Sequence, residues 1–429
     1  MLSGRLSKQT LLVLGGQVLG QIFMLASMPV LTRHFSPDTF GAYQLGLALG
    51  IIFQPLASLR VEFVIPVTGP EKHARRLYWT GLIFASLAAV VVVAAGYMLP
   101  GLAEGARDGA VVFGIMLGVN SLSAIDNAIL IRRGQRSRLA ARNLLYGVIA
   151  APLQVAVALL NPQIAWLAAV ALVARLTAIA ATSIGSAHFP APERGSGKKE
   201  PYGVQRGATT TIAGVISNSS VYGLIVLSGV LLSPAAAAQV GVAQRVTAGP
   251  IALIGQALSQ VFQARVATIQ RSADVGLGAA TRSFVRRLTV VAAPIAVAMM
   301  ILGPLLARPI LGAEWQEAGY VIAILAVPSC LQLVIAPTIP ILVMQRREAM
   351  LLRLQIVRLA AGVLAGGIPA VITGSALWAA LGFAMATTTA YFATIALTLR
   401  VCADYDASVA APVRGSEATT SAFQQPSPL

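Results

Sequence analysis

Five charged side chains lie inside long apolar runs of the sequence, where a charge is unfavourable unless it has a partner or a function. They are Arg60, Glu62, Asp126, Arg175 and Arg245. In a membrane helix each costs roughly 2.5–3.5 kcal/mol at the centre, so such residues face the protein interior or a wet cavity. Arg175 and Arg245 lie near the middle of their runs without an acid at the same depth. This arrangement favours binding of a negatively charged substrate.

Arg60 and Glu62 lie nearer the end of a run that is otherwise apolar from Phe40 onward. On a regular helix they would point about 200° apart, so we expect them to contact different neighbours and not each other. Asp126 lies about 9 Å from the same membrane boundary at 1.5 Å per residue. We therefore predict an Arg60–Asp126 pair, with Arg60, Glu62 and Asp126 forming a gate. A permanent structural ion pair is the simpler alternative.

Amide side chains on the apolar runs supply the remaining candidate positions for a cavity. These are Gln17, Gln21, Asn218 and Gln256. In the second run, Gln54, Ser58 and Glu62 recur every four residues and would form a polar stripe on one helix face. Hydrogen bonds between membrane helices explain such residues equally well, so both interpretations remain open.

The sequence offers little to an enzyme or a metal site. Its three histidines, His34, His73 and His188, fall far apart, and its two cysteines, Cys330 and Cys402, lie in or beside apolar runs. This spacing matches neither a disulfide framework nor a set of metal ligands. We expect no catalytic residues, no metal and no cofactor.

The elements that position these residues are membrane helices. The chain has 429 residues, 57% hydrophobic and 11% charged, whereas soluble domains carry roughly 25% charged residues. Its apolar runs approach the roughly 20 residues that cross a bilayer as a helix, and the first is too long for a signal-peptide core. We predict an all-α integral membrane protein with about twelve spans, at 9–32, 39–66, 76–99, 109–131, 139–160, 163–187, 206–232, 235–264, 284–307, 316–344, 352–373 and 375–401.

Basic residues alternate between the loops that join these spans. Of the 31 lysines and arginines, 25 fall in every second loop or in the span ends beside it, three in the other loops and three deep inside spans. The positive-inside rule then predicts that both termini are cytoplasmic. The net charge of +16 follows from this topology and from contact with anionic headgroups. It does not indicate nucleic-acid binding, which would need a soluble basic domain.

The spans divide into two halves of six. We predict an N-terminal lobe at 1–187, a cytoplasmic linker at 188–205, a C-terminal lobe at 206–402 and a disordered cytoplasmic tail at 403–429. Ser36-Pro37 opens the second span and Ser233-Pro234 opens the eighth, as a duplicated unit would produce. Parallel repeats of this kind place a substrate site at their interface and move by rocking. Frequent Ser-Pro helix starts are the alternative explanation.

Three stretches carry a resemblance to a known family. They run from Leu14 to Gln21 (LGGQVLGQ), from Pro29 to Tyr43 (PVLTRHFSPDTFGAY) and from Leu59 to Pro66 (LRVEFVIP). Their order resembles the start of bacterial polysaccharide transporters, the Wzx-type O-antigen and exopolysaccharide flippases. These belong to the multidrug/oligosaccharidyl-lipid/polysaccharide exporter (MOP) superfamily. Val61 stands where relatives usually carry an aromatic residue.

The resemblance implies two six-helix lobes around a central cavity lined by spans one, two, seven and eight. It implies a flippase in the bacterial inner membrane that moves undecaprenyl-diphosphate-linked oligosaccharide to the periplasmic leaflet by alternating access. Arg245 matches the cavity arginines of relatives by location only. The implied partners are this lipid-linked oligosaccharide, membrane lipids, Na⁺ or H⁺ as coupling ion, a glycan polymerase and a chain-length regulator. We expect a monomer.

Two other functions compete with this prediction. A multidrug or cation antiporter of the same superfamily would favour acids deep in the cavity, and only Glu62 and Asp126 lie within spans. A membrane polysaccharide polymerase or glycosyltransferase would need a sizeable external loop. The largest loop predicted on that side, from Arg308 to Gly319, has about a dozen residues. A scaffold without transport would leave the buried charges unexplained.

Overall fold

The computed structural model describes residues 8–66, 68–99, 104–183, 204–271, 275–345 and 347–410, and every regular element among them is a helix. Ten of these helices are long and apolar enough to cross a membrane. The predicted all-α membrane class is confirmed, whereas the count of twelve is not. The elements are α1 (Lys8–Ala26), α2 (Met28–His34), α3 (Pro37–Ala57), α4 (Val61–Val64), α5 (Glu71–Met98), α6 (Glu104–Arg132), α7 (Arg136–Leu160), α8 (Ile164–Ser183), α9 (Val204–Leu231), α10 (Pro234–Arg271), α11 (Leu277–Leu311), η1 (Ala313–Trp315), α12 (Gln316–Ile335), α13 (Ile339–Met344), α14 (Glu348–Thr373) and α15 (Ala376–Ala410).

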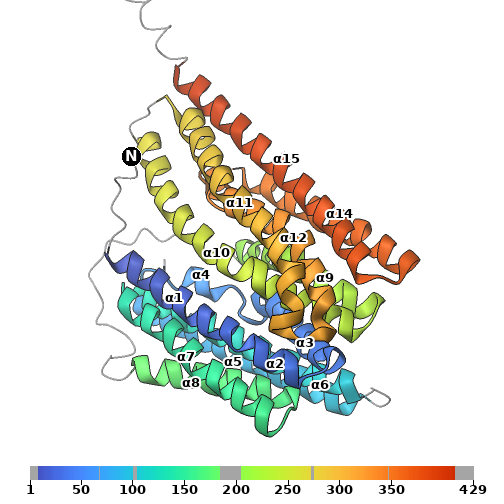
Figure 1. Ribbon diagram of the computed structural model, residues 1–429. Coiled ribbons are helices and arrows are strands. Elements are labelled where there is room, and N and C mark those ends of the chain that lie inside the picture. The colour runs from blue at the N-terminus through green and yellow to red at the C-terminus, as the bar shows by residue number, and fades with distance from the viewer. Residues whose placement is uncertain are drawn as a thin grey trace, which may run out of the picture.

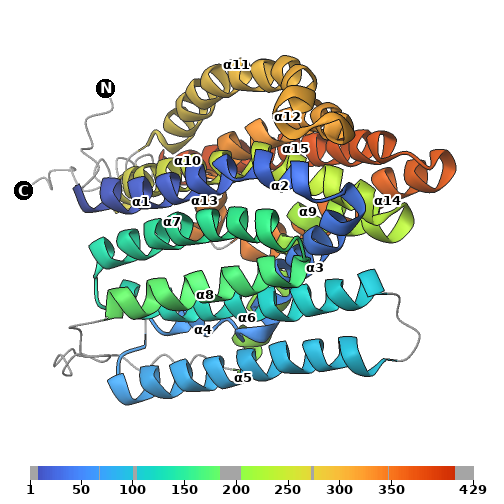
Figure 2. The same cartoon turned by 60° about the horizontal axis from the view of Figure 1, so that its bottom comes forward.

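The helices form two bundles, as Figures 1 and 2 show from two directions. Helices α1–α8 make one bundle and α9–α15 the other. The bundles meet where α3 packs against α9 and α10, and where α1 packs against α10. The proposed linker, 188–205, lies almost wholly outside the described residues, so its boundaries remain a prediction.

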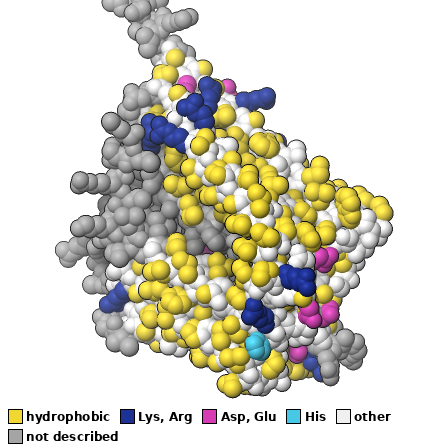
Figure 3. All heavy atoms as spheres, viewed as in Figure 1, with side chains coloured by type: hydrophobic (Ala, Val, Ile, Leu, Met, Phe, Trp, Pro, Cys, Tyr) yellow, Lys and Arg dark blue, Asp and Glu magenta, His cyan; other side chains and the backbone are white. Residues whose placement is uncertain are grey.

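The outer surface is that of a protein in lipid. Bulky aliphatic side chains on the outer helices are more than half exposed, for example Val90 at 63%, Leu305 at 65% and Val371 at 69%. In Figure 3 apolar side chains cover most of the described part of the visible face, and most charged ones lie towards its ends. Water would penalise such a surface, while hydrocarbon does not.

Small residues let the membrane helices approach closely. A Cβ atom on Gly147 of α7 would overlap the backbone of Gly20 on α1. Lipid tails are as apolar as leucine, so helices in membranes associate through close packing of this kind and not through hydrophobic transfer. Because glycine has no Cβ atom, α1 and α7 can pack with their backbones in contact at this point.

The two bundles are tied together at one end. The indole Nε1 of Trp315 donates to the carbonyl of Thr32 at 2.6 Å, and its ring packs edge-on against Phe40 with centroids 5.7 Å apart. Trp315 and Phe40 are at most 1% exposed. A Cβ atom on Gly41 would overlap the backbone of Pro234. The second and eighth predicted spans thus begin side by side.

The second predicted span, 39–66, is not one helix. Helix α3 begins with Pro37 in its first turn and Ser36 as its cap, whose Oγ accepts from the Thr39 N–H at 3.3 Å. It ends at Ala57, and α4 resumes at Val61. Between them Leu59 and Arg60 adopt φ of +52° and +53°, a left-handed conformation that costs a residue with a Cβ roughly 1–2 kcal/mol.

The proposed tail, 403–429, begins as helix, because α15 continues to Ala410. The side chain of Asp406 connects this part of α15 to the start of α11. Its carboxylate accepts from the backbone N–H groups of Gly276, Leu277 and Gly278, each at 2.9 Å. These groups start α11, so Asp406 caps a neighbouring helix. The remainder of the tail lies outside the described residues.

Replacing Asp406 with Ala should lower the stability of the folded protein by about 1–2 kcal/mol, the usual cost of losing a charged N-terminal cap. Thermal unfolding of the purified protein in detergent would measure the loss. The exposed Asp404 lies on the same helix, and Asp404→Ala should have little effect. Equal losses from both variants would contradict the capping role.

Candidate functional site

Two of the intramembrane arginines stack on tyrosines from other helices. The Arg175 guanidinium on α8 lies 3.8 Å from the ring centroid of Tyr146 on α7. The Arg245 guanidinium on α10 lies 5.6 Å from the ring centroid of Tyr43 on α3. Tyr146 also interacts electrostatically with both arginines and with Tyr43. We call Arg175, Tyr146, Tyr43 and Arg245 the arginine–tyrosine cluster.

This cluster crosses the interface between the bundles. Three members come from the N-terminal bundle, and Arg245 comes from α10 of the other. Arg245 Nη1 also lies 3.4 Å from the Sδ atom of Met28, a buried residue at the start of α2. A group held by the cluster would therefore contact both halves of the protein at once.

The cluster has cations without a matching anion. Within the described part of the chain, the ion pairs are Arg60 with Glu62 and Arg142 with Asp126. Arg175 and Arg245 take part in neither. The Nε and Nη1 atoms of Arg175 are buried and lack a hydrogen-bond partner. Cation–π contacts stabilise a guanidinium without neutralising it, so the cluster keeps its positive charge.

The predicted pair of Arg60 with Asp126 is wrong. Asp126 pairs with Arg142 from α7, and its Oδ1 accepts from the Tyr78 hydroxyl at 3.1 Å. Arg142 also donates to Thr182 Oγ1 at 3.0 Å. Asp126 and Arg142 are 5% and 1% exposed, so this pair is buried inside the N-terminal bundle. By sequence alone Arg142 belongs to the basic residues beside a loop, because it falls in the first turn of the fifth predicted span.

Arg60 and Glu62 do contact each other, against the expectation from a regular helix. Arg60 Nη1 and Glu62 Oε1 are 3.6 Å apart. The left-handed residues before α4 turn the chain, which removes the 200° separation. Gln54 Nε2 donates to Ser58 Oγ at 3.1 Å and to Glu62 Oε1 at 3.2 Å, so the predicted polar stripe becomes a hydrogen-bonded chain.

Arg60 reaches across to the other bundle at Gly214 of α9. A Cβ atom at Gly214 would overlap the Arg60 guanidinium. The space left by this glycine therefore determines where the cation of the Arg60–Glu62 pair can lie. The gating role of Arg60, Glu62 and Asp126 is not tested by this contact and remains a prediction.

The predicted amide positions divide between structure and interface. Asn218 Nδ2 donates to the Ile51 carbonyl at 2.6 Å and so links α9 to α3. The half-buried Gln21 approaches Gly249 of α10, whose added Cβ would lie 2.9 Å from Gln21 Nε2. Gln17 is half-buried on α1. Gln256 lies on α10, where its side chain is outside the described residues.

Sequence reasoning missed both tyrosines of the cluster. Tyr43 ends the stretch that carries the family resemblance, and that position was the one available signal. Tyr146 is a single aromatic residue in an apolar span and gave none. The predicted central cavity would have α10 as a wall, and many α10 side chains beyond Gly249 lie outside the described residues, so that cavity remains a prediction.

Metal ligands do not gather in the described parts of the chain, where no three His, Cys, Asp or Glu side chains come together. Cys330 and Cys402 are free and buried. The described site has two guanidinium groups, each lying over a tyrosine ring, with Arg175 in one bundle and Arg245 in the other.

Known structures share this arrangement of helices. A MATE protein in complex with MaL6 is 14% identical, with a TM-score of 0.63 over 93% of this chain and 96% of that one. The lipid II flippase MurJ, in an inward closed conformation, is 10% identical, with a TM-score of 0.63 over 94% and 90%. A MOP superfamily transporter from Pyrococcus furiosus is 11% identical, with a TM-score of 0.58 over 93% and 96%. No curated protein matches the chain.

The fold is therefore that of the membrane transporters of the MOP superfamily. The family model described as "Polysaccharide biosynthesis protein" matches residues 30–320, and the chain belongs to that family. The match confirms the resemblance to polysaccharide transporters. It spans Tyr43, Tyr146, Arg175 and Arg245, so the whole arginine–tyrosine cluster lies inside it.

Breaking the Asp126–Arg142 pair from one side should strongly destabilise the protein. Asp126→Leu or Arg142→Met alone leaves an unpaired buried charge, which typically costs about 3–5 kcal/mol. The double variant, combined with Tyr78→Phe, should recover most of that loss because it removes both charges of the pair and the hydroxyl that donates to Asp126. Unfolding in detergent would measure all three variants.

The exposed Asp108 provides a control for the loss of an acid, and Asp108→Leu should change stability by less than about 0.5 kcal/mol. If the combined variant were as unstable as the sum of the single changes, the pair would not be an isolated structural unit.

Proposed function

We propose that this protein is a flippase for a lipid-linked oligosaccharide in bacterial polysaccharide biosynthesis. It would move an undecaprenyl-diphosphate-linked glycan from the cytoplasmic to the periplasmic leaflet by alternating access. The observation that carries the proposal is the arginine–tyrosine cluster, with two guanidinium groups, two aromatic faces and no acid paired to either cation in the described residues. Membership of the polysaccharide biosynthesis family supports the substrate class.

The chemistry of the cluster fits such a headgroup. A diphosphate offers several acceptor oxygens to guanidinium groups, which bind phosphates through paired hydrogen bonds. Sugar rings stack on aromatic faces through their apolar C–H surfaces, and tyrosine hydroxyls can bond their oxygens. Because the cluster draws on both bundles, a bound headgroup would favour one arrangement of the bundles over another.

An antiporter for cationic drugs remains the alternative. It would need acids free to exchange a cation, but Asp126 is held by Arg142 and Tyr78, and Glu62 is held by Arg60 and Gln54. These contacts favour a structural role for both acids. The proposed transporter therefore binds an anion and uses Na⁺ or H⁺ as its coupling ion.

Loss of either cluster arginine should abolish most transport. Arg245→Ala and Arg175→Ala should each lower the flipping rate about tenfold or more, since a hydrogen bond to a charged group contributes roughly 1.5–3 kcal/mol. Arg→Lys should keep part of the rate, because lysine retains the charge but not the planar fork. Proteoliposomes containing undecaprenyl-diphosphate-linked oligosaccharide, with glycosidase access as readout, would measure this.

Arg358 provides a matched control, since it stacks on Tyr391 at 5.1 Å in the C-terminal bundle. Arg358→Ala removes a similar cation–π contact and should leave most of the transport intact. Full transport by both cluster Ala variants, reconstituted in equal amounts, would refute anion binding at the cluster.

We propose further that both termini face the cytoplasm of a bacterial inner membrane. The motive is the concentration of 25 of the 31 basic residues in alternate loops and the span ends beside them, which the positive-inside rule assigns to the cytoplasm. An alkaline phosphatase reporter, active only in the periplasm, should be silent when fused after Ala410 and active after Asn161. The opposite result at both positions would invert the topology.

A further inference from the structure

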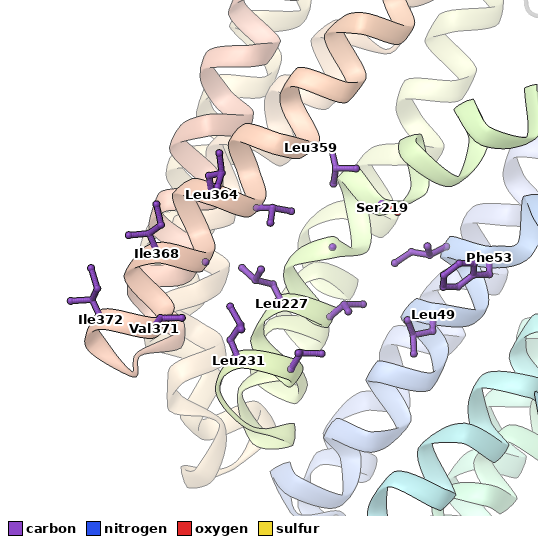
Figure 4. Close-up of a pocket in the computed structure, with 16 residues that line it drawn as sticks. Leu49, Phe53, Ser219, Leu227, Leu231, Leu359, Leu364, Ile368, Val371 and Ile372 are labelled. Carbon is purple, nitrogen blue, oxygen red and sulfur yellow. The ribbon is translucent and has the colours of Figure 1, made fainter. Parts of the chain in front are cut away.

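A long apolar groove opens on the side of the protein where the bundles meet. It has a volume of about 750 Å³ and lies between α3 of one bundle and α9 and α14 of the other. Figure 4 shows Leu49 and Phe53 on α3 facing Leu227 on α9, with Leu364 and Ile368 beyond them on α14. Among its described lining residues, Ser219 alone carries a polar side chain.

The groove runs along the helices for much of the membrane thickness. Its lining on α14 extends from Leu359 to Ile372, which is about 20 Å at 1.5 Å per residue. Its rim is open, since Leu364 and Ile372 are 60% and 76% exposed. All three helices qualify as membrane spans, so hydrocarbon chains and not water surround this rim. A chain lying along the groove would be parallel to the lipid chains beside it.

The groove adjoins the contact between the bundles. Ser219 and Ile52 line it, and their chain neighbours Asn218 and Ile51 form the 2.6 Å hydrogen bond that joins α9 to α3. A lipid whose head is held between the bundles must leave its tail in the bilayer through a seam between them. The groove is a preformed place for that tail at such a seam.

We infer that this groove binds the polyprenyl tail of the lipid-linked substrate, an inference that rests on the proposed function. Two glycines widen the site. An added Cβ atom at Gly367 would lie 3.6 Å and 3.7 Å from Cδ1 atoms of Leu227 and Leu231, and one at Gly223 would lie 3.9 Å from Leu359. Branched aliphatic walls with such hollows fit a chain that carries regular methyl branches. Polyprenyl carbons buried there are stabilised by the ordinary hydrophobic effect.

Photocrosslinking would test this assignment without requiring transport. A benzophenone amino acid is placed at Leu364 and, separately, at Leu231, in protein reconstituted into phosphatidylethanolamine–phosphatidylglycerol vesicles with a minor fraction of tritiated undecaprenyl phosphate. Both groove positions should label the polyprenyl lipid well above its share of the membrane. A probe at Val90, exposed on α5 and remote from the groove, should label lipids in proportion to their abundance.

Filling the groove should remove the preference. Gly367→Phe should lower polyprenyl labelling from Leu364 about tenfold, equivalent to losing contact with roughly two CH₂ groups. Gly367→Ala, which fits at ordinary contact distance, and Val90→Phe should leave the labelling close to that of the unsubstituted protein. Labelling from Leu364 and Leu231 in proportion to bulk lipid would overturn the assignment and make the groove a phospholipid site.

The inference and the proposed function can fail separately. Preferential polyprenyl labelling by a protein that moves no glycan in proteoliposomes would support the tail site and refute the flippase. Glycan transport that is unchanged by Gly367→Phe, together with proportional labelling, would support the flippase and refute the tail site.

Discussion

A charged side chain inside a bilayer must be paired, hydrated or bound to a ligand, because hydrocarbon offers it nothing. This constraint separates the buried charges of the protein into two groups. Asp126 forms an ion pair with Arg142 within one bundle, and Arg60 forms an ion pair with Glu62 beside the seam. Arg175 and Arg245 lie over tyrosine rings, Arg245 also approaches Met28 Sδ, and neither has an acid partner among the described residues. The candidate site therefore consists of the two arginines that no described acid neutralises.

The sequence was sufficient for the class of fold, because hydropathy and the family stretches are local signals. The partners of individual charges were not local. Arg60 was placed on a regular helix, but α3 ends at Ala57 and the chain turns through two left-handed residues. That break coincides with the placement of Arg60 against Gly214, a residue 154 positions later in the chain. The helical period of 3.6 residues predicts which residues share a face of one helix, but not which residues of a distant helix they contact.

The arginine–tyrosine cluster also could be predicted only in part from the sequence. Both arginines were found because a cation in an apolar run is conspicuous. Tyr43 and Tyr146 were missed because a tyrosine in a membrane span is unremarkable until the cation on its face is known. Arg142 was missed for a different reason. It belongs by sequence to a basic loop, and only the approach of α6 to α7 shows that it enters the bundle and meets Asp126.

The joint at Trp315 has a mechanical consequence. Trp315 bonds Thr32 and packs on Phe40, which fixes the bundles at one end of the molecule. From Thr32 back to Lys8 the first two helices extend for about 36 Å at 1.5 Å per residue. A rigid rotation of ~15°, the size seen between haemoglobin dimers, would carry their far end through about 9 Å. If the bundles rotate about the contact at Trp315, the start of α1, at the opposite face of the protein, moves much further than the residues around the indole ring.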